Sequence, residues 1–194
     1  EHVLRHYPTL AEAAAYVGGR QIRNRATCAG NIVNASPLAD TATPLYCHDA
    51  VMEIYGLPGC REVPIQEFIL FVRKVALKPG ELVTGIRVPY LPEAKGVFRK
   101  IARRNEVDLS TVCGTVLKTG DEYRIAMGSV APTPLRLPKT EALLKGKPLT
   151  DALIAEAAAL AATEVSPIDD VRADRQYRLD IVSYLVRDGL TKLR

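Results

Sequence analysis

Apolar and polar positions alternate along the middle of the chain in a way that predicts β-strands. Residues 51–55 and 60–64 are predicted to pair as a hairpin, because the glycines and proline of residues 56–59 form a turn between them. Residues 82–89 alternate Leu, Thr, Ile and Val with Val, Gly and Arg, which predicts a further strand.

A second group of strands follows a polar connection. Residues 90–96 contain Pro, Glu, Lys and Gly and mark a boundary. Three apolar segments come next, and Thr119-Gly120-Asp121 between the last two is typical of a hairpin turn. The simplest interpretation is three antiparallel strands, over residues 97–102, 109–118 and 123–130.

Helix-start signals come before both groups of strands. Thr9 and Glu12 have the spacing of a capping box, which predicts a helix that ends near Val17, before a Gly-Gly pair. Thr43 followed by Pro44 predicts the start of a second short helix over residues 44–49.

The last third of the chain has the composition and periodicity of helices. Thr150 is the expected N-cap of the alanine-rich one. The final helix is expected to bury one stripe, made of Tyr177, Ile181, Tyr184 and Leu185. The three helices are predicted over residues 140–145, 150–163 and 173–190. The order of elements predicts an α+β protein of two lobes, which we divide into residues 1–91 and 92–194.

Composition narrows the class of protein. The chain has 194 residues, a net charge of +4 and 6% aromatic residues without Trp, and its basic residues are scattered. A nucleic-acid partner is therefore not expected. Neither a membrane-length apolar run nor a signal peptide is visible. The spacing of the four cysteines matches no metal motif, which favours reduced thiols in a cytoplasmic protein. Since the chain begins with Glu1, we expect processing or truncation of a longer product.

The available chemistry points to a bound cofactor. No nucleophile motif, zinc motif or Walker-type phosphate loop is present, and His48 has no nucleophile pattern around it. We therefore predict neither catalytic side chains nor metal ligands on this chain. The small residues 27–31 predict a tight turn whose backbone N–H groups cradle a pyrophosphate, with Asp40 accepting hydrogen bonds from the cofactor. A surface loop in which Asp40 only caps the next helix is an equal alternative.

Several motifs resemble one family across nearly the whole chain. Gln21-Ile22-Arg23-Asn24, Ala26-Thr27, Gly30-Asn31 and Ser36-Pro37 with Asp40 are similar to the signature of the FAD-binding (medium) subunit of the molybdenum hydroxylases, the xanthine dehydrogenase family. The resemblance extends to residues 100–104, 108–110, 131–136, 166–172 and 177–178.

The resemblance implies a fold and a function. The fold would be the second lobe of a two-lobed FAD-binding domain, followed by a C-terminal domain of a three-stranded antiparallel sheet plus helices. In this family, electrons pass from a molybdenum centre through iron–sulfur clusters and FAD to NAD or another acceptor. The implied partners are an iron–sulfur subunit and a molybdopterin-binding large subunit, which would carry those cofactors.

The resemblance also implies roles for individual residues. Thr27, Cys28, Ala29, Gly30 and Asn31 would line the pyrophosphate and ribityl region of FAD. At the flavin end, Asp40 would accept or share a hydrogen bond and Val83 would make an apolar contact with the ring. Lys100 would place a positive charge near the flavin, which favours its reduced, anionic form. For Lys100, a place on a solvated basic face is the alternative.

Two departures from the family pattern affect these expectations. Ala29 stands where the family has a second glycine, which would be costly only if that residue needs a positive φ. The family's first lobe, with its own glycine-rich loop, is not found before Pro8, so we expect a separate fragment to supply it. A non-catalytic docking module that binds no flavin by itself is the second hypothesis. An unrelated flavoprotein or nucleotide-binding domain that shares only the loop is the third.

Overall fold

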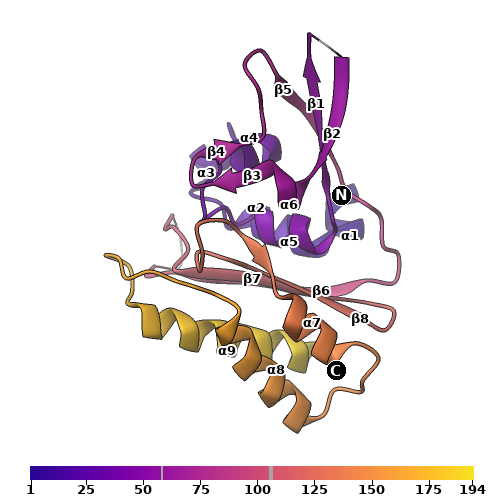
Figure 1. Ribbon diagram of the computed structural model, residues 1–194, viewed down its shortest axis with the longest axis vertical. Helices are drawn as coiled ribbons and strands as arrows, with labels where there is room; N and C mark the ends of the chain where they lie inside the picture. The colour runs from indigo at the N-terminus through magenta and orange to yellow at the C-terminus, as the bar shows by residue number, and fades with distance from the viewer. Residues whose placement is uncertain (58, 105–106) are drawn as a thin grey trace.

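The computed structural model describes residues 1–57, 59–104 and 107–194. In Figure 1 the elements lie in successive layers: a projecting three-stranded sheet, a group of short helices, a four-stranded sheet and a pair of long helices. The elements of the first half of the chain occupy the upper layers, and those of the second half form the lower sheet and the helices beneath it.

The first half of the chain is mixed, as its residue pattern predicts. Its three-stranded sheet has the order β2-β1-β5, with both pairs antiparallel, so the hairpin predicted from residues 51–64 is confirmed. Pro58, in the predicted turn, lies outside the described residues. The helices are α1 (His2–His6), α2 (Pro8–Ala15), α3 (Arg20–Arg23), α4 (Cys28–Val33), α5 (Ala42–Cys47) and α6 (Ile65–Phe68). The strands are β1 (Val51–Gly56), β2 (Gly59–Pro64), β3 (Ile69–Phe71), β4 (Lys74–Val75) and β5 (Leu82–Arg87).

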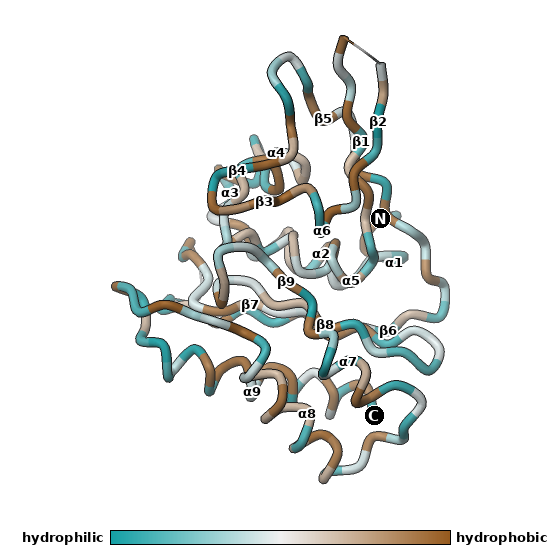
Figure 2. Tube along the Cα trace, in the orientation of Figure 1, coloured by the Kyte–Doolittle hydropathy of each residue, from teal (hydrophilic) through white to brown (hydrophobic). Residues whose placement is uncertain are grey.

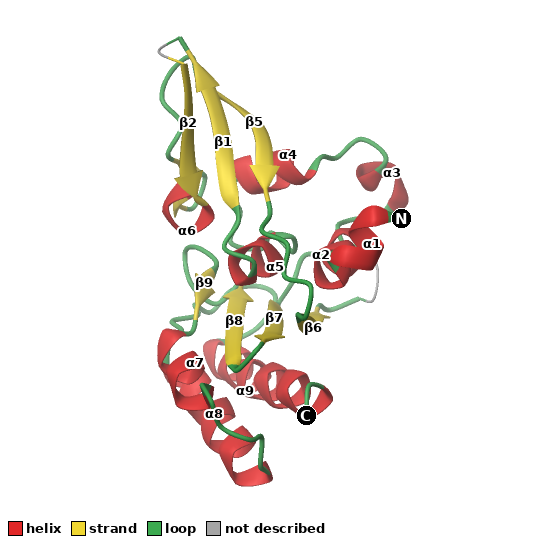
Figure 3. Cartoon of the chain, turned by 90° about the vertical axis from the view of Figure 1, so that its right-hand side faces the viewer, coloured by secondary structure: helices red, strands yellow, loops and turns green. Residues whose placement is uncertain are grey.

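The second half is a sheet followed by helices. Strands β6 (Lys95–Ile101), β7 (Val112–Thr119), β8 (Glu122–Gly128) and β9 (Leu135–Arg136) pair antiparallel in chain order. The helices are α7 (Pro138–Leu144), α8 (Asp151–Thr163) and α9 (Arg175–Lys192). The three predicted strands are therefore confirmed, and β9 is a short addition that the sequence did not signal. The side view in Figure 3 shows α8 and α9 below the sheet and α5 above it.

The four-stranded sheet is covered on both faces. One hydrophobic core lies between the sheet and helices α7 to α9, and includes Val116 and Ile125. The other lies among α4, α5 and the upper sheet, and takes Leu117 and Ala126 from the same two strands. Consecutive residues of β7 and β8 thus face opposite cores. This is why β7 is buried over six successive positions.

Two predicted helix starts differ from the structure. Helix α2 begins at Pro8, which suits the first helical position, and Thr9 makes no capping hydrogen bond. Helix α5 begins at Ala42, and the hydroxyl of Thr43 instead lies 2.9 Å from the hydroxyl of Thr115 in the buried interior. Thr150 does cap α8, since its side chain accepts a hydrogen bond from the amide of Leu153.

The predicted stripe on the last helix is partly wrong. Tyr177 and Tyr184 are 45% and 54% exposed, whereas Leu185 is buried as expected. The buried face of α9 instead contains Val182, Val186 and Leu190. In this arrangement the two tyrosines keep about half of their surface exposed, and smaller aliphatic residues pack on the sheet. Figure 2 shows the resulting alternation of hydrophobic and hydrophilic stretches along α8 and α9.

Candidate functional site

The small residues 27–31 form the start of helix α4 rather than the tight loop expected. Thr27 is the N-cap: its backbone is extended, and its hydroxyl accepts a hydrogen bond of 2.9 Å from the amide of Gly30. Gly30 permits this approach, because a Cβ there would lie 2.9 Å from the Thr27 hydroxyl. Ala29 has helical backbone angles, so the missing family glycine causes no strain at this position.

The first turn of α4 leaves backbone donors available. The amides of Cys28 and Ala29 have no hydrogen-bond acceptor among the described residues, as is usual for the first turn of a helix. Thr27 and Cys28 are exposed. The side chain of Asn31 makes a structural contact instead. Its oxygen accepts a hydrogen bond of 2.6 Å from the hydroxyl of Thr41 and so links α4 to the start of α5. The turn thus presents unpaired N–H groups on a braced helix end.

Asp40 and Lys100 form a buried ion pair. The Lys100 ammonium on β6 donates to Oδ2 of Asp40 at 2.8 Å, and the two side chains are only 7% and 6% exposed. The same ammonium donates to the backbone oxygen of Tyr16 at 3.0 Å. Oδ1 of Asp40 accepts a hydrogen bond from the hydroxyl of Ser110. The alternative of a solvated basic face for Lys100 is therefore wrong.

Burial and pairing act in opposite directions on the Asp40 carboxyl. Loss of hydration raises its pKa, while the hydrogen bonds and charge of Lys100, and the hydroxyl of Ser110, lower it by a smaller amount. Burial also raises the pKa of the neighbouring Cys113 thiol, and the nearby Asp40 charge raises it further. Cys113 is therefore a neutral thiol at neutral pH beside the Asp40–Lys100 pair.

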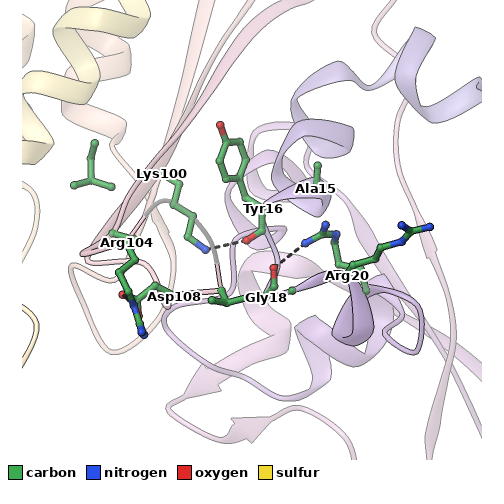
Figure 4. Close-up of a pocket in the computed structure, with 12 residues that line it drawn as sticks. Ala15, Tyr16, Gly18, Arg20, Lys100, Arg104 and Asp108 are labelled. Carbon is green, nitrogen blue, oxygen red and sulfur yellow. Dashed lines mark hydrogen bonds and ion pairs between the residues drawn. The ribbon is translucent and has the colours of Figure 1, made fainter.

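Two neighbouring cavities lie beside these groups. The larger, of about 740 Å³, is lined by Lys100, Tyr16 and a set of further residues from α2, α3 and the segment after β6. Figure 4 shows the Lys100 ammonium directed at the Tyr16 carbonyl within it. The smaller, of about 430 Å³, is lined by Thr27, Cys28 and Asn31 together with apolar residues of α1 and α2. Ala15 and Arg23 line both cavities, so the two are adjacent.

The structure gathers some of the predicted site residues and separates others. Lys100 lines one cavity and Thr27, Cys28 and Asn31 line the other, whereas Ala29, Gly30, Asp40 and Val83 line neither. Asp40 lies behind Lys100 as its buried partner. Val83, on β5, is half-buried and packs against the core of the first half of the chain. A direct contact of Val83 with a flavin ring stays a prediction.

Sequence reasoning missed several residues of the larger cavity. Arg20, Arg23 and Arg104 bring positive charge to its lining. Arg23 stood inside the Gln-Ile-Arg-Asn motif, so a signal was available. Its guanidinium donates to the carbonyls of Val17 and Gly18, which ties α3 to the end of α2. Arg104 likewise stood inside the motif of residues 100–104, whereas Arg20 had no comparable signal, because scattered arginines are usually solvated.

This set of donors suits an extended anionic ligand. Unpaired amides and a hydroxyl at a helix start bind phosphate oxygens, and a buried ammonium with cationic neighbours adds positive charge in a place where water screens it little. The exposed ring of Tyr16 and the apolar wall of the smaller cavity offer contact area for a flat or aliphatic portion. The residues present therefore fit a phosphate-bearing cofactor such as FAD.

Comparison with known proteins decides the family. Residues 1–91 match the FAD binding domain in molybdopterin dehydrogenase, and residues 97–193 match the CO dehydrogenase flavoprotein C-terminal domain. The chain belongs to the family of FAD-binding medium subunits of the molybdenum hydroxylases. The fold and the family expected from the sequence motifs are thus confirmed.

Individual relatives of this medium-subunit family agree over almost the whole chain. The putative xanthine dehydrogenase FAD-binding subunit of Escherichia coli is 34% identical over 97% of this chain and 67% of the relative. The carbon monoxide dehydrogenase medium chain of Hydrogenophaga pseudoflava is 31% identical over 94% of this chain and 66% of the relative. The chain spans about two thirds of the length of these relatives.

Solved structures of the family share the fold. Carbon monoxide dehydrogenase from Hydrogenophaga pseudoflava matches with a TM-score of 0.91 and 32% identity, over 97% of this chain and 68% of that chain. Quinoline 2-oxidoreductase from Pseudomonas putida matches with a TM-score of 0.90 and 26% identity, over 98% of this chain and 68% of that chain.

Within the described residues, none of the helices has the length and apolar character needed to cross a membrane.

Proposed function

We propose that this chain forms one wall of an FAD site in a molybdenum hydroxylase complex and takes part in electron transfer there. FAD, when bound, accepts electrons from iron–sulfur clusters and passes them to NAD or another acceptor. The observation that carries the proposal is the buried Lys100 ammonium, which lines a cavity of about 740 Å³ while paired with Asp40.

Lys100 would act on the flavin by its charge. Its ammonium donates to Asp40 and to the Tyr16 carbonyl, so one of its three N–H groups is left for a ligand in the cavity. A positive charge held beside a flavin favours the reduced, anionic state over the neutral one. Asp40 balances that charge and fixes the position of the ammonium.

The start of α4 would hold the phosphates. The unpaired amides of Cys28 and Ala29 and the adjoining Thr27 hydroxyl point to an anion at this position, and Gly30 keeps the turn tight. The placement of Asn31 next to Thr41 braces this turn against α5. These groups need no covalent chemistry to act, which agrees with the absence of nucleophile motifs in the sequence.

The proposal includes the partners that the family resemblance implies. These are an iron–sulfur subunit and a molybdopterin-binding large subunit, acting together with this chain in the cytoplasm. The names of the relatives, a FAD-binding subunit and a medium chain, support a role within a multi-subunit enzyme.

We also propose that the chain divides into two lobes, residues 1–91 and 92–194. This division falls within the polar connection that comes before β6.

The test is purification of the chain with its natural partners, followed by the flavin absorption spectrum and identification of the co-purifying polypeptides. Stoichiometric FAD, together with iron–sulfur and molybdopterin subunits, is the expected result. Addition of NAD to the dithionite-reduced complex should restore the oxidised flavin spectrum if NAD is the acceptor. A colourless complex that contains an iron–sulfur partner would refute flavin binding and favour the docking module instead.

A further inference from the structure

A buried chain of hydrogen bonds connects the two halves of the molecule beside the larger cavity. Ser110, just before β7, is fully buried, and its hydroxyl donates to Oδ1 of Asp40, which stands just before α5. The other carboxylate oxygen accepts from the Lys100 ammonium. The chain of contacts therefore runs from a hydroxyl outside the lining of the larger cavity to an ammonium within that lining.

Both oxygens of Asp40 are thereby fixed. A carboxylate that accepts from two donors on different segments has one preferred rotation of its plane. Lys100 is fixed in turn, because Asp40 and the Tyr16 carbonyl hold its ammonium from two sides, as Figure 4 shows for Tyr16. Its remaining N–H is thus oriented by the Tyr16 carbonyl at the cavity wall and, from outside the lining, by Asp40 and Ser110.

We propose that Ser110 is a positioning residue of the FAD site: its hydroxyl fixes the carboxylate of Asp40, and Asp40 fixes the ammonium of Lys100 at the wall of the cavity. This inference rests on the proposed function. Without the hydroxyl, Oδ1 of Asp40 would lie in a buried environment without the Ser110 donor, and the carboxylate would turn toward Lys100 or take up a proton.

The electrostatic consequence has a definite direction. The titratable groups beside Asp40 are Lys100 on β6 and Cys113 on β7. Burial raises the pKa of Asp40, and the hydrogen bond from Ser110 is one of the contacts that oppose this rise. Its removal therefore raises the pKa of Asp40 further. The ion pair with Lys100 would then be lost at a higher pH than in the wild type.

The experiment compares Ser110→Ala with Thr111→Val. Thr111 is also buried, and in the described part of the chain no hydrogen bond joins its hydroxyl to Asp40 or Lys100. Two quantities are measured: the titration of the Asp40 carboxyl by ¹³C NMR without flavin, and the FAD dissociation constant of the whole complex against pH. In Ser110→Ala we expect the Asp40 titration at higher pH and FAD binding weakened about fivefold to tenfold at neutral pH. Thr111→Val should match the wild type in both.

The outcomes separate this inference from the proposed function. A wild-type complex without FAD refutes both, whatever the NMR titration shows. A wild-type complex with FAD, beside a Ser110→Ala variant that keeps the wild-type titration and pH profile, refutes only the role of Ser110. Ser110→Cys has nearly the same size and a weaker donor, so it should give an intermediate titration. If Ser110→Ala does not fold, Ser110→Cys replaces it in both the Asp40 titration and the FAD-binding measurement.

Discussion

Asp40 and Lys100 hold opposite charges where water hardly reaches, with side-chain exposures of 6% and 7%. Removal of one partner leaves the other charge buried and unpaired, which is far more costly than removal of both. The pair therefore couples stability to the proposed cofactor role, since Asp40 holds the Lys100 ammonium that lines the cavity.

The variant Asp40→Asn should lower the free energy of unfolding by about 3 kcal/mol, because it leaves the Lys100 ammonium unpaired. The double variant Asp40→Asn, Lys100→Met should recover most of that loss, since no buried charge remains. FAD retention should stay low in both. Urea denaturation and flavin absorbance measure the two effects. Additive losses of stability in the double variant would contradict the coupling.

At the scale of elements, helix starts depend on single side chains. The hydroxyl of Thr150 accepts from the amide of Leu153 at 3.2 Å at the start of α8. Thr150→Ala should therefore lower the free energy of unfolding by about 1 kcal/mol, measured by thermal denaturation. Thr191→Ala, at the exposed end of α9, is the matched control and should change stability much less. Equal effects of the two would show that the cap is not what stabilises α8.

A bidentate ion pair joins β2 to the segment before β5. Arg61 donates to both oxygens of Glu81, and this pairing lowers the pKa of Glu81 to about 2 from its ordinary value of 4.5. Since the folded pKa is depressed, the stabilisation is present above about pH 4.5 and is lost as the pH falls through 2.

The wild type should therefore lose stability more steeply than Glu81→Gln as the pH falls from 4.5 to 2, because the variant has no carboxylate to protonate. Urea midpoints at several pH values across this window measure the effect. Glu156→Gln, at an exposed position of α8, should keep the wild-type pH dependence. Parallel curves for the wild type and Glu81→Gln would disprove the assignment to this pair.

The local elements were largely predictable, because strands, turns and caps depend on near neighbours. The hairpin of residues 51–64 and the cap at Thr150 are examples. The start of α4 was predicted as a loop, since small residues favour turns and the Thr27 cap was given no weight. The burial of Lys100 could not be predicted, because its acceptors Asp40 and Tyr16 lie 60 and 84 residues away in the sequence.

The same reasoning explains the error on α9. A helical stripe that contains Tyr177 and Tyr184 is plausible from spacing alone, but the sheet selects the adjacent face with Val182 and Val186. Which face of α9 becomes buried depends on the surface against which the helix packs. That surface is formed by strands more than 50 residues earlier, such as β7, and no local pattern contains it.

At the scale of the whole molecule, the sheet β6–β9 belongs to both hydrophobic cores. Leu117 on β7 is 2% exposed and packs in the upper core, while its neighbour Val116 packs in the lower one. A sheet shared in this way leaves little room for one half of the chain to unfold before the other. The two halves should therefore unfold as a single cooperative unit.

Leu117→Ala should lower the free energy of unfolding by about 2–5 kcal/mol, the usual cost of truncating a buried leucine. Unfolding followed by circular dichroism and by tyrosine fluorescence should give one coincident transition in both the wild type and the variant. Leu57→Ala, at a fully exposed position, is the control and should leave the midpoint unchanged. Two separate transitions would show that the halves are energetically independent.

The contact of Asp40 with Lys100 and Ser110 joins residues from opposite sides of the proposed boundary at residues 91 and 92. Chimaeras that join two medium subunits at this boundary therefore test whether the residue at position 40 from one parent can pair with the residues at positions 100 and 110 from the other. A chimaera that takes residues 1–91 from this chain and the remainder from a relative would pair Asp40 with donors supplied by the relative. Such a chimaera should keep its flavin only when the relative provides an ammonium and a hydroxyl at the positions of Lys100 and Ser110.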